Sequence, residues 1–271
     1  MAIKKNKKNE MTKFIKKYEK RTFILSKKLT KKLRNPILIE GLPGIGFVGK
    51  LAAEYIAKEL KGKKIAELYS YYFPHQVMMR KNGLIRMLKY KIYLVSTKQR
   101  DLLVLVGDLQ PVNSEAQYEI AIQVLKYFKM LGGSFVITLG GYSTGIPITN
   151  ARVLGAATHK EVVSEFSKHG IIFGEARGAI LGAAGLFLGL GKILGLKGIC
   201  LMGETHGAYI DAQSAKAVLE KLKQILKLDL DLSKIEETAK ETEKIIKKIE
   251  AEIAKEKEEL AKQSNELSYI R

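Results

Sequence analysis

The stretch that decides the fold is residues 36–50, which read Pro36-Ile-Leu-Ile-Glu40 and then Gly41-Leu-Pro-Gly-Ile-Gly-Phe-Val-Gly-Lys50. The apolar run before Glu40 predicts a buried β-strand, and the residues after the glycines predict a helix over 47–60. Glycine permits the tight turn that joins a strand to a helix packed closely beside it. The stretch therefore predicts the strand–turn–helix opening of an α/β domain.

The glycine loop matches two nucleotide-binding patterns and completes neither. Gly44, Gly46 and Gly49 fit G-x-G-x-x-G, while Gly44, Gly49 and Lys50 fit the phosphate-loop pattern G-x-x-x-x-G-K. These four residues are the candidate ligand-binding positions of the loop. In a phosphate loop the next residue supplies a hydroxyl to Mg²⁺, but this chain has Leu51, whose side chain cannot bind a hard cation.

The dinucleotide interpretation fails at a second position. It needs a carboxylate about 20 residues further on to bind the ribose. The nearest candidate, Glu67, lies inside the predicted strand 64–70 when it should lie at its end. We therefore favour a structural role for the glycines and expect no cofactor and no enzymatic activity. A nucleotide- or nucleoside-processing enzyme that uses the 41–50 loop is the alternative.

From residue 36 to about residue 228, short β-rich runs alternate with helical segments. Runs such as 102–106 and 135–139 are continuously apolar, as a sheet covered on both faces requires. We predict a three-layer α/β domain with a mostly parallel or mixed central sheet. The expected strands are 37–40, 64–70, 84–88, 91–96, 102–107, 134–139, 171–173 and 197–202. The expected helices are 47–60, 114–131, 160–169, 178–194 and 213–227.

The expected helix over 178–194 is unusually rich in glycine, which costs about 1 kcal/mol relative to alanine at each helical position. Gly178, Gly182, Gly185 and Gly189 repeat at spacings of four, three and four, so they form one smooth stripe on a helix. Such a stripe lets a neighbouring backbone approach closely. We expect this helix to pack against the sheet or against a second subunit.

A net charge of +19 in 271 residues often indicates a nucleic-acid or membrane partner, so its distribution matters. Residues 1–34 carry fourteen Lys and Arg against two Glu, a net charge of +12 that leaves +7 for the remainder. The excess belongs to a basic N-terminal arm over 1–35, with one helical face made of Phe14, Ile15, Tyr18, Phe23, Ile24 and Leu25. No aromatic-rich recognition motif accompanies the lysines, so we expect a solvated arm without nucleic acid. Nonspecific contact of the arm with RNA or with an acidic protein is the alternative, and the corresponding function would be a basic RNA-associated scaffold.

The chain has a single cysteine, Cys200, which excludes an internal disulfide and a cysteine-bearing metal cluster and indicates a reducing compartment. Its longest uncharged apolar run, 178–190, is much shorter than the about 20 residues that span a bilayer. No signal segment follows the lysine-rich start. The four histidines lack metal-ligand spacing. We expect a cytoplasmic protein with no membrane partner and no metal.

A polar loop, Gly203-Glu-Thr-His-Gly-Ala-Tyr-Ile-Asp211, follows an apolar strand, where α/β proteins place ligand sites. Glu204, His206 and Asp211 are candidates for an acid–base group. The alternative, which we favour, is that these residues satisfy the loop and cap the next helix.

After Asp231 the composition changes to Lys, Glu, Ile and Ala. Positions 235, 239, 242, 246, 249, 253, 256, 260, 263 and 267 step by four and three, the spacing of a coiled-coil seam. We predict an α/β domain over 36–230 and a long C-terminal helical extension over 231–271. A helix over 233–263 would extend about 45 Å. Packing on neighbouring subunits and projection as an arm are both open.

Five short motifs occur in order along residues 36–228. They are Gly41-Leu-Pro-Gly-Ile-Gly-Phe-Val-Gly49, Gly107-Asp-Leu-Gln-Pro111, Gly140-Gly-Tyr142, Arg177-Gly178 with the glycine-rich segment after it, and Gly203-Glu-Thr205. As a set they resemble the archaeal proteasome-assembly-chaperone family. The resemblance implies a phosphorylase- or hydrolase-like α/β topology without an established catalytic site. It also implies binding to proteasome α-subunits by a homo-oligomer, a tetramer or pentamer.

The resemblance gives a partner-binding role to the last residues, Leu267-Ser-Tyr-Ile-Arg271. Proteasome activators and chaperones commonly finish in hydrophobic-Tyr-X, where the terminal carboxylate pairs with a lysine between α-subunits. Here Tyr269 stands one place too early and Ile270 occupies the usual tyrosine position. The resemblance implies that Leu267, Tyr269, Ile270 and Arg271 contact the α-ring, and a frayed terminus is the alternative.

Overall fold

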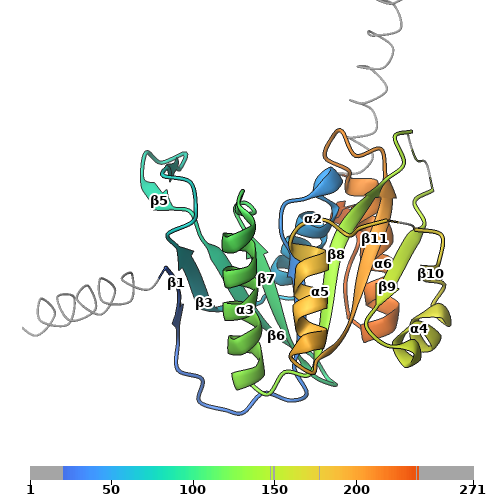
Figure 1. Cartoon of the computed structure of the whole chain (residues 1–271), viewed down its shortest axis with the longest axis horizontal. Coiled ribbons are helices and arrows are strands. Elements are labelled where there is room, and N and C mark those ends of the chain that lie inside the picture. Colours follow the sequence, from blue (N-terminus) through green and yellow to red (C-terminus); the bar gives the residue numbers. More distant parts are fainter. Residues whose placement is uncertain (1–20, 147, 149, 177, 236, 238–271) are drawn as a thin grey trace, which may run out of the picture.

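The computed structural model describes residues 21–146, 148, 150–176, 178–235 and 237, and within them nine strands form one sheet with helices on both faces (Figure 1). The strands are β1 (Thr22–Ser26), β2 (Ile37–Gly41), β3 (Lys63–Ser70), β6 (Tyr90–Ser96), β7 (Asp101–Gly107), β8 (Phe135–Ser143), β9 (Val153–Ala157), β10 (Ile172–Phe173) and β11 (Lys197–Thr205). The helices are α2 (Val48–Glu59), α3 (Ser114–Met130), α4 (Lys160–Ser167), α5 (Ala183–Ile193) and α6 (Ala212–Leu226), and the 3-10 turn η1 (Ile45–Phe47) precedes α2. Two further strands, β4 (Val77–Met79) and β5 (Ile85–Met87), form a separate hairpin.

The sheet has the order β1-β3-β6-β7-β2-β8-β11-β9-β10. Its centre is parallel, because β2 runs alongside β7 and β8 in the same direction and β11 continues in parallel from β8. Towards one edge, β6, β3 and β1 add antiparallel strands. Towards the other, β9 is antiparallel to β11 and β10 is parallel to β9. The mixed sheet brings the carboxyl ends of the four parallel strands to one edge.

The hydrophobic core has two halves because successive residues of a strand point to opposite faces of the sheet. In β2, Ile37 and Ile39 pack in the cluster that contains residues of α2 and α6. Leu38 packs in the cluster that contains residues of α3 and α5. Figure 1 shows α3 and α5 together over one face of the sheet. These two clusters confirm the predicted covering of the sheet on both faces.

Two helices begin at the polar residues that helix physics favours. Asn113 caps α3, where its side-chain oxygen accepts a hydrogen bond from the backbone N–H of Ala116 at 2.8 Å. Asp211 caps α6 in the same way, since its side-chain oxygen accepts a hydrogen bond from the backbone N–H of Ser214 at 2.9 Å. Each cap satisfies one of the N–H groups that a helix leaves without a partner in its first turn. Asp211 thereby has the capping role that we favoured for the 203–211 loop.

The main errors of the sequence interpretation lie at the two sides of the sheet. Residues 23–25, expected on a helical face of the basic arm, belong to strand β1, which pairs with β3. Phe23 is 5% exposed, so this part of the arm contributes to the core. Strand β9 was not expected, because its sequence VLGAA has few of the large β-branched residues that mark strands.

The glycine-rich helix is shorter than predicted. It begins at Ala183, and both Gly178 (φ 99°) and Gly182 (φ 73°) adopt the left-handed backbone conformation before it. The predicted four-glycine stripe is therefore wrong, since Gly185 and Gly189 alone of those four lie on the helix.

The predicted long C-terminal helix falls almost entirely outside the described residues, as do Leu267, Tyr269, Ile270 and Arg271. The core itself extends beyond residue 230, because Ile235 is 4% exposed and packs in the same cluster as Leu228 and Leu230.

Candidate functional site

The glycine loop lies where the sequence placed it, at the carboxyl end of β2, and three of its glycines, Gly41, Gly46 and Gly49, are explained by contacts within the chain. A Cβ atom on Gly49 would lie 2.1 Å from the carbonyl oxygen of Leu139 in β8. A Cβ on Gly41 would lie 2.2 Å from the carbonyl oxygen of Gly49. Real Cβ atoms do not approach backbone so closely, so both positions exclude any side chain. The two glycines let α2 pack directly onto β2 and β8.

Gly46 serves a second contact, with the loop before α6. It has φ 60°, and its carbonyl oxygen accepts a hydrogen bond from the backbone N–H of Asp211 at 2.8 Å. A Cβ at this position would lie 2.8 Å from the hydroxyl oxygen of Thr205. The Thr205 hydroxyl in turn donates to the Asp211 carboxylate at 2.6 Å. The loop between β2 and α2 is thus fastened to the end of β11.

Lys50, the candidate phosphate-binding lysine, pairs along its own helix. Its Nζ atom lies 3.8 Å from a carboxylate oxygen of Glu54, one helical turn further on. The next residue, Leu51, packs against the core cluster of the α2 and α6 face. Gly44 is exposed, and a Cβ there would meet the Gln110 side chain at an ordinary 3.7 Å. Of the four candidate ligand positions, Gly46 and Gly49 have a structural reason to be glycine.

Glu204, His206 and Asp211 do not form one acid–base group. Glu204 accepts two hydrogen bonds from the Arg152 guanidinium, at 2.6 and 2.9 Å, which hold the pKa of its carboxyl below the usual value. The Asp211 carboxylate accepts hydrogen bonds from the Thr205 hydroxyl and from the backbone N–H of Ser214 in α6. The His206 ring stacks on Tyr209, with centroids 5.1 Å apart. The three side chains therefore take part in separate interactions.

A buried carboxyl group lies at the end of β2, directly before the glycine loop. Glu40 is 1% exposed, and one of its oxygens accepts the backbone N–H of Leu42 at 3.1 Å. Its other oxygen has no hydrogen-bond partner among the described residues, and neither has the hydroxyl of Thr138, the neighbouring residue in β8. Burial raises the pKa of Glu40 to about 8. The protonated form therefore predominates at neutral pH.

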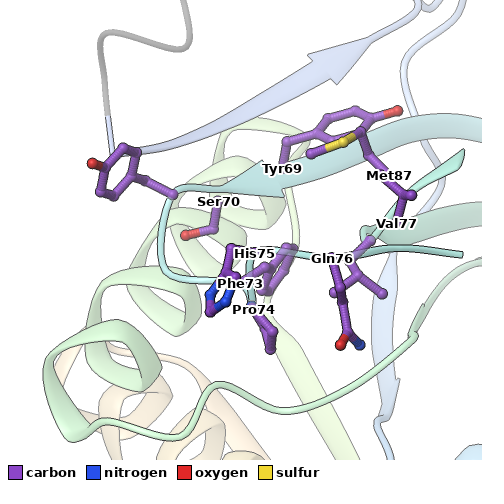
Figure 2. Close-up of a pocket in the computed structure, with 10 residues that line it drawn as sticks. Tyr69, Ser70, Phe73, Pro74, His75, Gln76, Val77 and Met87 are labelled. Carbon is purple, nitrogen blue, oxygen red and sulfur yellow. The ribbon is translucent and has the colours of Figure 1, made fainter.

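A concave surface lies elsewhere, beside the β4–β5 hairpin. It is a cavity of about 680 Å³ between the end of β3, the loop after it and the hairpin. Figure 2 shows the lining side chains gathered around the loop that carries Phe73, Pro74 and His75, with Val77 and Met87 of the hairpin close together. In Figure 1 the hairpin stands at one end of the molecule, apart from the helices.

The base of the hairpin is fixed to the body of the domain by charged groups. Arg86 in β5 donates two hydrogen bonds to the Asp108 carboxylate, one of them at 2.8 Å. The same carboxylate accepts the backbone N–H of Lys89 at 3.0 Å. Burial opposes ionisation of Asp108, but the hydrogen bonds from Arg86 and Lys89 and the nearby positive charges together outweigh it and lower the pKa of the carboxyl. This paired, two-pronged contact holds the hairpin in one orientation.

The sequence predicted a strand over 84–88, whereas the hairpin was not predicted. The available signal was Asn82-Gly83, a dipeptide typical of hairpin turns, between the apolar run 77–79 and the mostly apolar run 84–88, which contains Arg86. Gly83 has φ 77°, the conformation that such a turn requires. The turn chemistry was readable, although the exposure of the apolar side chains was not.

Within the described ranges, no group of three His, Cys, Asp or Glu side chains is arranged to hold a metal ion. None of the helices in those ranges is both long and apolar enough to cross a bilayer.

Residues 38–250 match the model of the PAC2 family, and the chain belongs to that family. It is 40% identical over 205 residues to the uncharacterised protein MJ1210 of Methanocaldococcus jannaschii, covering 76% of this chain and 79% of that protein.

Two solved structures are similar over most of the chain. The Pyrococcus furiosus protein PbaB, an archaeal proteasome activator, is 42% identical with a TM-score of 0.80, over 85% of this chain and 99% of that one. PbaA of the same organism, an archaeal homologue of a proteasome-assembly chaperone, is 25% identical with a TM-score of 0.72. The match covers 90% of this chain and 98% of that one. These findings confirm the family resemblance that the ordered motifs indicated.

Proposed function

We propose that this protein is an ATP-independent binding protein of the proteasome core particle, acting as an activator or assembly chaperone in the cytoplasm. Its direct partners are the α-subunits, and a homo-oligomer presents several copies of the binding surface. The observation that carries the proposal is the similarity to PbaB, which extends over 99% of that activator at 42% identity.

The geometry of the glycine loop supports a binding role over an enzymatic one. Gly41 and Gly49 are accounted for by backbone packing, and Lys50 pairs with Glu54. Glu204, at the end of β11, is bound by Arg152, and Asp211 caps α6. These side chains therefore have structural roles that require no substrate.

In this proposal the C-terminal segment makes part of the contact, with Leu267, Tyr269, Ile270 and Arg271 at the α-ring. Several such segments on one oligomer would act together. Linked contacts of this kind raise the overall affinity by roughly 10²–10⁴ over a single contact. A weak individual contact by the displaced Tyr269 is therefore compatible with tight binding of the whole assembly.

The test is binding of the full chain and two truncations to purified proteasome core particle. Removing residues 238–271 is the appropriate deep truncation, because a cut at Ser233 would remove Ile235 from the core. We expect that removal of 238–271 weakens binding by about 10²-fold or more, and that removal of 269–271 reproduces most of this loss. Surface plasmon resonance on immobilised core particle measures both.

The outcomes separate the candidate functions. Normal binding by the 269–271 truncation with failure of the 238–271 truncation would show that the longer segment, not its end, makes the contact. No binding by the full chain would overturn the proposal. Calorimetry with Mg-ATP tests the nucleotide alternative, for which we expect no binding heat; micromolar binding that disappears in Lys50→Ala would favour an enzyme.

A further inference from the structure

We propose that the outer face of the β4–β5 hairpin, together with the cavity at its base, is a docking surface for an extended protein segment that carries apolar side chains and carboxylates. The inference stands apart from the proposed function, because it rests on the hairpin alone and its test contains no proteasome.

The hairpin presents one apolar face to solvent. Residues directly opposite each other in an antiparallel pair point to the same side, and the register pairs Val77 with Met87 and Met79 with Ile85. All four side chains are exposed, Met79 at 78% and Ile85 at 69%. The other side carries Arg86, which is bound to Asp108. The apolar side therefore faces away from the contact that anchors the hairpin.

This apolar face continues into the cavity. Val77 and Met87 line the cavity as well as the hairpin face, so one surface runs from the hairpin to the loop with Phe73 and Pro74 (Figure 2). An isolated two-stranded hairpin has marginal stability in water, and leaving two apolar cross-strand pairs exposed adds to that cost. A hairpin held rigidly in this state is suited to bury these side chains against a partner.

The backbone and the methionines indicate how the partner is held. Strands β4 and β5 pair with each other and with no other described strand, so each has a free edge that an extended segment can join. Methionine side chains adapt to varied apolar contacts and recur at surfaces that accept more than one sequence. Apolar side chains of a segment paired in this way would enter the cavity beside the hairpin.

Local charge selects an acidic segment. Residues 71–90, which include the hairpin and the loops on either side of it, contain four Lys and Arg and no Asp or Glu. Arg86 and Lys89 pair with Asp108 and Glu67. Arg80 and Lys81, at the turn, are exposed and make no ion pair within the described part of the chain. These two cations complement carboxylates. The hairpin of a second copy would instead bring its own Arg80 and Lys81 towards them, and the like charges would repel each other.

The cavity distinguishes a protein segment from a lipid surface. An anionic membrane attracts Arg80 and Lys81 and accepts apolar side chains, but a flat bilayer surface does not fill a concave site of about 680 Å³ beside the hairpin. Side chains of an extended segment fill such a site. The observations therefore favour a protein segment, and membrane binding becomes an outcome of the test.

The experiment measures binding of two dye-labelled model peptides to the full-length protein by fluorescence anisotropy. One peptide is Glu-Leu-Glu-Val-Glu-Leu-Glu-Val, and the matched peptide has Lys in place of each Glu. The hairpin variant is Met79→Ser with Ile85→Ser, and the matched control is Met78→Ser on the opposite face. A charge variant reverses Arg80 and Lys81 to Glu. Every variant keeps the basic residues 1–35, so differences among them report on the hairpin.

We expect the acidic peptide to bind at least about tenfold more tightly than the basic one. The hairpin and charge variants should each weaken its binding by about tenfold or more, while Met78→Ser changes it less than about twofold. Unchanged circular dichroism and thermal midpoint would show that the exposed substitutions leave the fold intact.

Three results would overturn the inference. The first is a negative peptide assay: either the acidic peptide does not bind at millimolar concentration, or it binds the hairpin variant as tightly as the wild type. The second is loss of sedimentation with phosphatidylglycerol vesicles in the hairpin variant without loss of peptide binding, which would assign the face to a membrane. The third is a fall in the light-scattering mass of the hairpin variant, which would assign it to a second copy of the chain.

Discussion

Glu40 is a residue of the described chain at which burial and the chemistry of the side chain conflict. It sits in the central strand, 1% exposed, with one oxygen bound to the Leu42 N–H. A charged carboxylate in such a place is costly, and the folded chain reduces that cost by keeping the proton. The pKa of about 8 expresses this preference.

This shift predicts a pH-dependent stability. Between the ordinary pKa of about 4.5 and the folded value, the unfolded state releases the Glu40 proton while the folded state retains it. The free energy of unfolding should therefore fall by about 1.4 kcal/mol per pH unit in this window, which is a few kcal/mol between pH 5 and pH 8. Glu40→Gln, which cannot ionise, should lack this loss and be more stable than the wild type at pH 8.

Urea denaturation at pH 5 and pH 8 measures the effect. Glu67→Gln is the matched control: burial opposes its ionisation, but hydrogen bonds from Lys64, Lys89 and Tyr69 lower its pKa to about 2. The stability that Glu67 contributes is lost as pH falls towards that value, so its substitution should cost the same at pH 5 and pH 8. An equal pH response of Glu40→Gln and the wild type would contradict the assignment.

At the scale of single elements, α5 shows how a glycine-rich helix is tolerated. Its first turn is approached by the preceding loop of the same chain, since a Cβ on Gly185 would lie 2.1 Å from the carbonyl oxygen of Ile180. Gly189, one turn further on, has no atom within 4 Å of its Cβ position. Gly185 is therefore required by packing, whereas Gly189 has no such requirement in the described structure.

The two glycines predict opposite effects of the same substitution. Gly185→Ala should destabilise the protein by about 1–3 kcal/mol, because the added methyl group must displace a backbone carbonyl. Gly189→Ala should stabilise it by about 0.5–1 kcal/mol through helix propensity alone. Differential scanning calorimetry on both variants is the measurement. A destabilising Gly189→Ala without a change of oligomeric mass would contradict the open environment described for that position.

At the scale of the whole molecule, the basic N-terminal segment has two parts, because its second part forms the edge strand β1 of the sheet. Strand β1 covers the edge of β3, and its Phe23 is buried while Thr22 and Ser70 share a hydrogen bond at 2.9 Å. Residues 1–20 lie outside the described chain and carry eight Lys and two Glu. The contribution of the charged residues 1–20 and the contribution of strand β1 to stability can therefore be tested separately.

Deletion of residues 1–20 should leave the thermal midpoint nearly unchanged, whereas deletion of residues 1–27 should lower it by several degrees. Burying a phenylalanine contributes about 1.5–3 kcal/mol, and each kcal/mol shifts the midpoint of a domain this size by about 2–4 °C. Deletion of 1–27 also exposes β3 as a sheet edge and should increase aggregation. Equal midpoints for the two truncations would show that β1 adds nothing to stability.

RNA retention on the same truncations tests the remaining alternative function. Loss of salt-dependent RNA binding on removing residues 1–20 would support a basic scaffold. We expect little RNA binding by either form.

The sequence alone determined the alternation of elements and the family, because both depend on local patterns. Apolar runs such as 102–106 identified buried strands, and the ordered glycine motifs carried the resemblance. It also located the glycine loop between β2 and α2. The role of Asp211 as a cap was likewise readable, since capping depends on the residues of one helical turn.

Tertiary structure alone decided what depends on neighbours distant in sequence. Residues 22–26 have an ambiguous local pattern, and pairing with β3 makes them a strand. Gly178 and Gly182 continue a helical spacing, yet they adopt left-handed conformations outside α5. The exposure of Met79 and Ile85 cannot be read from the sequence either, because burial is set by which surfaces the rest of the chain covers.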